Sequence, residues 1–470
     1  MTDDTSDPAS SFDPGSFRDP LSRVLLDGDR VTRVFRDRGV EDLAALQAST
    51  FFVEAQRDGR IVGTHPTELA LGLSDDGWEV AVEHDRVPVI SYPYEWTFSM
   101  LQDAALEQLA LTRSALSEGL LTKDATPYNT QFVGASPMFI DIGSFEGLPP
   151  REPWRGYRQF CMLFYLPLLL QATIDVPFQP LLRGSLHGIT PETARRMLPV
   201  RHRGGKGAFT NVVLHARLER RNAGSQRDAG AELSRAGYGP KLIDAQLAKL
   251  ERSVGGLRWA AAESEWSNYT DRGHYETEEL EQKAAFVERV ARRGGPTTVV
   301  DLGANDGHFS KLVAPFAKTV VAVDSDSLVV DRLYRSLRAE NDRVILPLYT
   351  DLTDPSPALG WRGRERSPLT ERVDADLVLA LALVHHLAIT GTVPLPEVVA
   401  MLRDFDADVV VEFPDRGDPM VERLLGRKRT GLFDRYTLDD FVAAADARFE
   451  TVDQVTLRSG RRHLFHLTPR

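Results

Sequence analysis

The sequence predicts a doubly wound α/β domain in its C-terminal part, preceded by a mixed α+β domain and a helical connector. Three observations support this prediction. After about residue 263, short apolar runs alternate with helix-length intervals, which is typical of a parallel sheet covered by helices. Before residue 200, strand-like runs such as Val31–Phe35 and Val87–Ile90 precede a long helical pattern from Thr97 to Leu120. At 470 residues the chain is also longer than one hydrophobic core usually organises.

The composition narrows the classes of partner and compartment. The net charge is −12 at pH 7, and hydrophobic residues make up 42% of the chain, which is enough for globular cores. An acidic chain has no general attraction to nucleic acid or to an anionic membrane, since both depend on clustered Lys and Arg. The single cysteine, Cys161, rules out an intramolecular disulfide and a thiolate-rich metal site. We therefore expect a cytoplasmic protein, with its oligomeric state left open.

Four stretches of the chain differ in composition and in the pattern of their apolar residues. Residues 1–20 are rich in Ser, Asp and Pro and are expected to form a disordered tail. Residues 21–200 form the α+β domain, 201–262 the helical connector and 263–470 the α/β domain. The apolar run Phe160–Leu170 is too short to cross a bilayer and contains Pro167, so we interpret it as a buried helix.

A glycine-bearing turn follows the first strand pattern of the C-terminal domain. Thr297–Leu302 has the pattern of a buried strand containing Asp301, and Gly303 and Gly307 flank a turn that leads into a helical run from His308. The glycines let backbone pass close to a nucleotide-shaped ligand and let the helix start pack tightly. The G-x-x-x-G spacing differs from the G-x-G-x-x-G of a dinucleotide site, and the nearby carboxylates suit a methionine ammonium better than a phosphate.

The next three strand patterns also end in polar residues. The second ends at Asp324, whose carboxylate can accept both ribose hydroxyls, and the third ends near Asp351, placed for an adenine amino group. The fourth, Asp376–Leu383, runs into His385 and His386. One acidic strand end is commonplace, because such residues cap helices and form turns. The ordered series predicts a site for S-adenosylmethionine, with no metal required.

These motifs together resemble the class I S-adenosylmethionine-dependent methyltransferases. The successive stretches that carry the resemblance are VVDLGANDGHFS, VVAVDSD, LYTDLTDPSPALGW and DLVLALALVHHLAI. From Asp351 to VPLPEVV the sequence is more similar to nodulation-type methyltransferases. The resemblance covers the chain well from about Trp266 onward and implies a Rossmann-like fold for that part.

The resemblance also implies a role for individual positions. The implied cofactor contacts are Asp301, Gly303, Gly307, Asp324, Asp351, Ala380, Leu381 and Ala382. Asp324 would hold the ribose and Asp351 the adenine, while Ala380–Ala382 would form the floor beneath the transferred methyl group. Trp266–Tyr269, with Tyr275 and Lys283, resembles the helical lid that precedes the first strand in many such enzymes.

Three residues are candidates for handling the acceptor's proton. Methyl transfer is an in-line displacement at a sulfonium carbon, so the protein must align the nucleophile and remove its proton where it has one. His386 and His385 are candidate bases because histidine titrates near neutrality, and the alternative is that they cap the strand or line the pocket. Glu412, near the end of ADVVVEF, is a further candidate that could hold an amine or hydroxyl.

A second constellation lies in the first domain. Asp124 and Asn129 follow the long helical pattern, and Asp141 opens a D-x-G turn after a strand pattern. This spacing resembles the catalytic loop and metal-binding segment of the protein-kinase-like fold, in which an Asp orients the acceptor hydroxyl and an Asn and a second Asp hold magnesium. The sequence departs from that pattern: it has no G-x-G-x-x-G loop and no V-A-I-K-type lysine, and the region before Tyr92 is short. Arg33 is the nearest basic strand residue.

The sequence therefore predicts a methyltransferase whose first domain recognises a small-molecule, saccharide or peptide acceptor. O- and N-methylation stay open. Two alternatives also stay open: a bifunctional enzyme with phosphoryl transfer at Asp124, Asn129 and Asp141, and a cofactor-binding regulator without turnover. The intact glycines and acidic strand ends argue against the regulator.

Overall fold

The computed structural model describes residues 11–70, 72–149, 152–199, 239–260 and 277–470. Most of the expected connector, the lid segment around Trp266 and the first ten residues of the expected tail lie outside these ranges. The chain divides into two compact units, and neither is continuous in sequence. Unit 1 consists of Met1–Phe132, Pro137–Ala260 and Ala358–Arg366, and unit 2 of Val133–Ser136, Ala261–Pro357 and Ser367–Arg470.

Unit 1 contains a five-stranded antiparallel sheet in the order β1-β2-β3-β5-β4. Its strands are β1 (Ser11–Phe12), β2 (Ser22–Asp27), β3 (Arg30–Phe35), β4 (Thr64–Thr67) and β5 (Val80–His84). Helices α1 (Arg38–Gln47) and α2 (Thr50–Arg57) connect β3 to β4. The strand predicted at Val87–Ile90 is wrong: that segment is a loop after β5, and its Pro88 has no amide to donate to a sheet.

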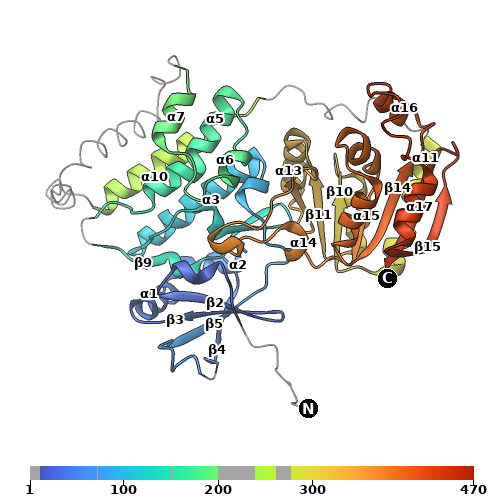
Figure 1. Cartoon of the computed structure of the whole chain (residues 1–470). Coiled ribbons are helices and arrows are strands. Elements are labelled where there is room, and N and C mark those ends of the chain that lie inside the picture. Colours follow the sequence, from blue (N-terminus) through green and yellow to red (C-terminus); the bar gives the residue numbers. More distant parts are fainter. Residues whose placement is uncertain (1–10, 71, 150–151, 200–238, 261–276) are drawn as a thin grey trace, which may run out of the picture. The chain divides into compact units, whose positions relative to one another are not determined.

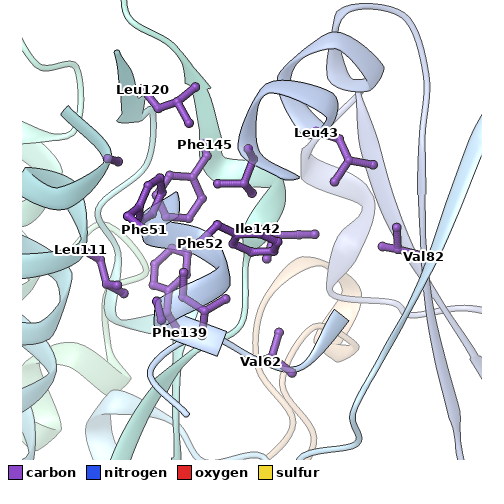
Figure 2. Packing of buried hydrophobic residues seen from close by; sticks show 14 of the residues in the cluster. Leu43, Phe51, Phe52, Val62, Val82, Leu111, Leu120, Phe139, Ile142 and Phe145 are labelled. Atoms are coloured by element: carbon purple, nitrogen blue, oxygen red, sulfur yellow. The ribbon is translucent and has the colours of Figure 1, made fainter. Parts of the chain in front are cut away.

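An aromatic core joins α2 to the later part of unit 1. Phe51 and Phe52 of α2 are buried in a cluster that also contains Phe139, Ile142 and Phe145 (Figure 2). The rings of Phe139 and Phe145 lie 5.5 Å apart, and those of Phe51 and Phe145 lie 5.6 Å apart. In sequence, Asp141 lies between Phe139 and Ile142, which both belong to this cluster, so the packing fixes the backbone that carries Asp141.

The rest of unit 1 is mostly helical. The predicted long helix is α3 (Phe98–Ser117), and Thr97 caps it by accepting a hydrogen bond from the Met100 amide. The run Phe160–Leu170 forms consecutive buried helical turns, as predicted. No helix in the described part of the chain is long and apolar enough to cross a membrane. The other described elements, from β6 to α10, are β6 (Leu120–Thr122), β7 (Thr130–Val133), β8 (Ser136–Phe139), β9 (Phe145–Gly147), α4 (Tyr157–Phe160), α5 (Leu166–Ile174), α6 (Gln179–Arg183), α7 (Pro191–Met197) and α10 (Pro240–Gly255).

Unit 2 is built on a seven-stranded sheet in the order β12-β11-β10-β13-β14-β16-β15. The first five of these strands are parallel, and β16 runs antiparallel to both of its neighbours. Their bounds are β10 (Thr298–Leu302), β11 (Thr319–Asp324), β12 (Ile345–Tyr349), β13 (Leu377–Ala380), β14 (Asp408–Pro414), β15 (Phe449–Thr456) and β16 (Arg462–Pro469). The predicted alternation of strands and helices is therefore present in this unit.

Helices flank this sheet (Figure 1), and its strand order reverses at β10. The helices are α11 (Thr277–Gly294), α12 (His308–Val313), α13 (Ser327–Glu340), α14 (Leu369–Arg372), α15 (Leu395–Arg403), α16 (Pro419–Leu425) and α17 (Leu438–Asp446). The chain runs outward from β10 through β11 to β12 and then returns to the other side of β10 as β13. Open α/β sheets bind ligands beyond the carboxyl ends of the strands at such a reversal.

We predict that Gly307→Ala destabilises unit 2. Gly307 precedes α12 with φ of +78°, and a Cβ there would lie 2.7 Å from Cδ1 of Leu333. An alanine would carry the strain of a left-handed backbone and displace the leucine, at a cost of about 1–3 kcal/mol. Thermal unfolding should show a lower Tm. The matched control is Gly294→Ala, at a helical end with open space, and equal shifts for the two variants would contradict the prediction.

Candidate active site

The turn after β10 is fastened to the end of the neighbouring strand. The amides of Gly303 and Ala304 both donate to the carbonyl of Val323, at 2.8 and 2.9 Å. Gly303 and Gly307 have φ of +78° and Asn305 has φ of +49°, so the turn uses three left-handed positions. A Cβ on Gly303 would make only ordinary contact with Leu383, at 3.4 Å. Gly303 is therefore required for its backbone conformation more than for space.

Asp324 lies beside this turn as the last residue of β11. Its Oδ2 accepts a hydrogen bond from the Asn305 amide and its Oδ1 one from the Asp326 amide, both at 2.9 Å. Burial raises the pKa of Asp324, and the two backbone donors oppose that effect. Each carboxylate oxygen has a second lone pair, so the oriented group can accept further hydrogen bonds from a ligand.

Asp301 is a buried residue of β10 whose side chain contacts α12. Its carboxyl is buried, and its Oδ2 accepts a 2.6 Å hydrogen bond from Oγ of Ser310 on α12. Burial raises the pKa of Asp301 to about 6, although the Ser310 bond and the charge of Lys283 act against it. The side chain thus ties α12 to β10 beneath the turn.

The remaining predicted contacts lie at the ends of the neighbouring strands. Asp351 follows β12 by two residues, and its Oδ1 accepts hydrogen bonds from the amide and hydroxyl of Thr353, at 2.8 and 2.7 Å. Ala380 ends β13, and Leu381 directly after it is also buried. Because these strands are parallel, the sheet brings Gly303, Asp324, Asp351, Ala380 and Leu381 to one edge.

Glu412 is held by three donors in the interior of unit 2. Its Oε2 accepts from Nζ of Lys283 at 2.6 Å and from the Ala382 amide at 2.8 Å, and its Oε1 accepts from Nη1 of Arg462 at 2.9 Å. Burial alone would raise the pKa of Glu412, but the charges of Lys283 and Arg462 outweigh it and lower the pKa to about 2. The carboxylate is therefore ionised at neutral pH, with two hydrogen bonds accepted by Oε2 and one by Oε1.

Two members of this network, Arg462 and Asp418, have no counterpart in the sequence prediction. Arg462 begins β16, where the antiparallel register pairs it with Pro414, and its Nε donates to Oδ2 of Asp418 at 2.7 Å. Asp418 also caps α16 through the Met420 amide. The signal that could have indicated Arg462 is the basic pair Arg461-Arg462 at the start of the last strand, which points to a buried partner only once the strand pairing is known.

The two histidines lie side by side after β13. Their ring centroids are 4.1 Å apart. His385 is fully buried, and neither ring nitrogen has a hydrogen-bond partner in the described part of the chain. Burial, followed by the neighbouring His386 and the charges of Arg462 and Lys283, lowers the pKa of His385 well below its usual value. Burial and the charge of Arg462 lower the pKa of His386 to about 4, so both imidazoles are neutral at pH 7.

The second predicted constellation comes together in unit 1. Asp141 accepts a 2.8 Å ion-pair hydrogen bond from Nη1 of Arg33, which lies on β3. Arg33 also donates from Nε to Nε2 of His84, and burial and the Arg33 charge lower the pKa of His84 to about 3, leaving it a neutral acceptor. Asn129 is buried, with no partner for its Nδ2 among the described residues. Burial and the charge of Asp141 both raise the pKa of Asp124.

A comparison with known sequences identifies the family. No protein-family model matches the chain. "Nodulation protein NoeA" of Rhizobium meliloti (strain 1021) is 33% identical over 457 residues, which cover 96% of this chain and 94% of that relative. The chain belongs to the NoeA family. The match spans the sequence of both units.

Two solved methyltransferase structures each match less than half of this NoeA-family chain. N-methyltransferase NodS from Bradyrhizobium japonicum WM9, in complex with S-adenosyl-l-homocysteine, is 12% identical with a TM-score of 0.32, covering 44% of this chain and 99% of NodS. Magnesium protoporphyrin IX methyltransferase from Synechocystis PCC 6803, with the same ligand, is 16% identical with a TM-score of 0.30, covering 41% and 84%. What this NoeA-family chain binds has to follow from its own residues.

Proposed function

We propose that this NoeA-family protein is an S-adenosylmethionine-dependent methyltransferase. Unit 2 would bind the cofactor and transfer its methyl group to an oxygen or nitrogen of a small-molecule, saccharide or peptide acceptor, and unit 1 would assist recognition of that acceptor. The observation that supports this most directly is the turn from Gly303 to Gly307, fastened to Asp324 where the strand order reverses.

The residues that follow the carboxyl ends of β10 and β11 fit this cofactor better than a phosphorylated one. Asp324 is held by two backbone amides with lone pairs left for ribose hydroxyls. The turn from Gly303 to Gly307 contains no Lys or Arg, and Asp306 and Asp324 would repel a pyrophosphate. S-adenosylmethionine supplies an activated methyl group on a cationic sulfur, so the protein has to orient the nucleophile and remove its proton.

We assign proton removal to His386. Its imidazole is neutral at pH 7 and follows the strand whose end would lie beneath the methyl group. A pKa of about 4 makes this imidazole a weak base, so it would take the proton only as the new bond forms and the acceptor becomes acidic. Glu412 already accepts hydrogen bonds from Lys283, Arg462 and the Ala382 amide. His385 would act by packing against His386 from its fully buried position.

We predict that Asp324→Ala weakens S-adenosylmethionine binding by about 1–3 kcal/mol, or roughly 5- to 150-fold in Kd, because hydrogen bonds at a buried polar site are left unmade. Isothermal calorimetry on the full chain measures this directly. Asp408→Ala is the matched control, since Asp408 begins β14 at the opposite edge of the sheet. Binding of a nicotinamide dinucleotide in place of S-adenosylmethionine would overturn the proposal.

We predict that His386→Ala lowers turnover about 10²- to 10⁴-fold with little change in cofactor affinity, since positioned proton transfer contributes on that scale. An acceptor can be found by the mass increase that one added methyl group produces in metabolite extracts. With a pKa near 4, His386 stays neutral on acidification, so any loss of rate from its protonation should lie well below pH 6.5. His466→Ala, beside Asp408, is the control. A collapse of cofactor affinity would instead make His386 part of the cofactor pocket.

A second candidate function for unit 1 is phosphoryl transfer. Arg33 on β3 contacts Asp141, and protein kinases carry a basic residue on their third strand close to the nucleotide phosphates. Arg33 is thus a basic partner for Asp141, although the sequence has no V-A-I-K-type lysine. However, Arg33 is engaged with the carboxylate that magnesium would need, which favours the recognition role.

We predict that the intact protein shows no tight magnesium-dependent binding of ATP, because the Arg33–Asp141 ion pair occupies the would-be metal ligand. Calorimetric titration of ATP with magnesium, on the wild type and on Asp141→Asn, measures this. Tight binding that disappears in the variant, with phosphate appearing on an acceptor, would favour the bifunctional enzyme instead.

A further inference from the structure

The chain leaves β13 through a backbone conformation that needs support. Ala382 has φ of +52°, in the left-handed region that is unfavourable for alanine. The bend at Ala382 redirects the chain from the strand into the helical turn that carries His385 and His386. Leu383, directly after the bend, lies at ordinary contact distance from the position a Cβ on Gly303 would take. The conformation of Ala382 therefore affects both the loop that carries the histidines and the contact of Leu383 with the Gly303 turn.

The Ala382 amide donates its hydrogen bond to Glu412. The distance to Oε2 is 2.8 Å, and the carboxylate is fully buried. A backbone amide bound to an ionised carboxylate forms a charge-assisted hydrogen bond, which is about twice as strong as a neutral one. Such a bond can offset the cost of the left-handed backbone at Ala382.

Glu412 is itself kept charged and in place by residues from distant elements. Lys283 comes from α11 and Arg462 from β16, and Asp418 at the start of α16 holds Arg462 from its other side. All four side chains are buried. Buried ion networks of this kind are often no more stabilising than apolar side chains of similar volume, so stability alone does not account for this one.

We propose that Glu412 is a positioning residue that holds Ala382 in its left-handed conformation and so fixes the loop carrying Leu383 and His386 against the Gly303 turn. The inference rests on the proposed function, because that loop is taken as part of the cofactor and acceptor site. It differs from the earlier expectation for Glu412, which was direct contact with an acceptor amine or hydroxyl.

The test is a rescue experiment on the full chain. In Glu412→Gln the side chain is neutral and has one acceptor oxygen, and its amino group faces either Arg462 or both Lys283 and the Ala382 amide, so the bond to Ala382 is weakened or lost. S-adenosylhomocysteine affinity, measured by calorimetry, should fall by about 10-fold. Adding Ala382→Gly removes the left-handed strain, because glycine populates that region freely, and should restore most of the affinity.

The matched control for the rescue is Asn341→Gly in the Glu412→Gln background. Asn341 ends α13 with φ of +54°, so the change relieves a left-handed residue in the same unit without touching the loop. Asn341→Gly should leave the S-adenosylhomocysteine affinity low, even where it raises the Tm. Equal rescue by Asn341→Gly and Ala382→Gly would show that only global stability matters, and would overturn the inference.

Two further outcomes separate the inference from the proposed function. If the wild type does not bind S-adenosylhomocysteine or S-adenosylmethionine, the proposed function fails, and the inference fails with it. If the wild type binds but Glu412→Gln keeps full affinity, or Ala382→Gly gives no rescue, the inference alone fails. A Glu412→Gln variant with normal affinity but no turnover would return Glu412 to a direct role at the acceptor.

Discussion

The buried carboxylate of Glu412 and its three donors form the interaction on which the geometry of unit 2 most depends. A fully buried charge is costly unless it is paired and hydrogen-bonded, so each donor must be delivered to within hydrogen-bond distance. Helix α11 delivers Lys283, the antiparallel pairing of β16 with β14 delivers Arg462, and the bend after β13 delivers the Ala382 amide. The packing of α11, β16 and the bend after β13 therefore all depends on contacts with the Glu412 side chain.

How much of unit 2 the sequence could predict depends on how local the signal is. The strand ending before Gly303 and the strand ending at Asp324 are visible because apolar runs, glycines and acidic ends lie within a few residues of one another. The Glu412–Arg462 contact is not visible, because it joins residues from two strands that become neighbours only through the sheet order. Asp301 is an intermediate case: its position on β10 was predicted, but the direction of its side chain toward Ser310 depends on where α12 packs.

Unit 1 shows the same limit in another form. The helix after Thr97 and the order of Asp124, Asn129 and Asp141 could be predicted from sequence, whereas the sheet before Tyr92 was only partly recognised. Strand β4 consists of the residues Thr-His-Pro-Thr, which carry no apolar alternation. A domain boundary drawn at a single point in the sequence also could not assign Ala358–Arg366. This segment lies between two strands of unit 2 in sequence but belongs to unit 1.

The ion pairs of unit 2 also affect the electrostatic surroundings of His386. Glu412, Asp418, Lys283 and Arg462 neutralise one another, and Asp301 is buried against Ser310, while burial keeps both histidines uncharged. In the proposed reaction a sulfonium becomes a neutral thioether, so positive charge leaves the sulfur as the new bond forms. A neutral imidazole can take the proton that the acceptor releases. The network that sets the backbone at Ala382 also places Arg462 where its charge lowers the pKa of His386, so positioning and electrostatics both depend on the same ion pairs.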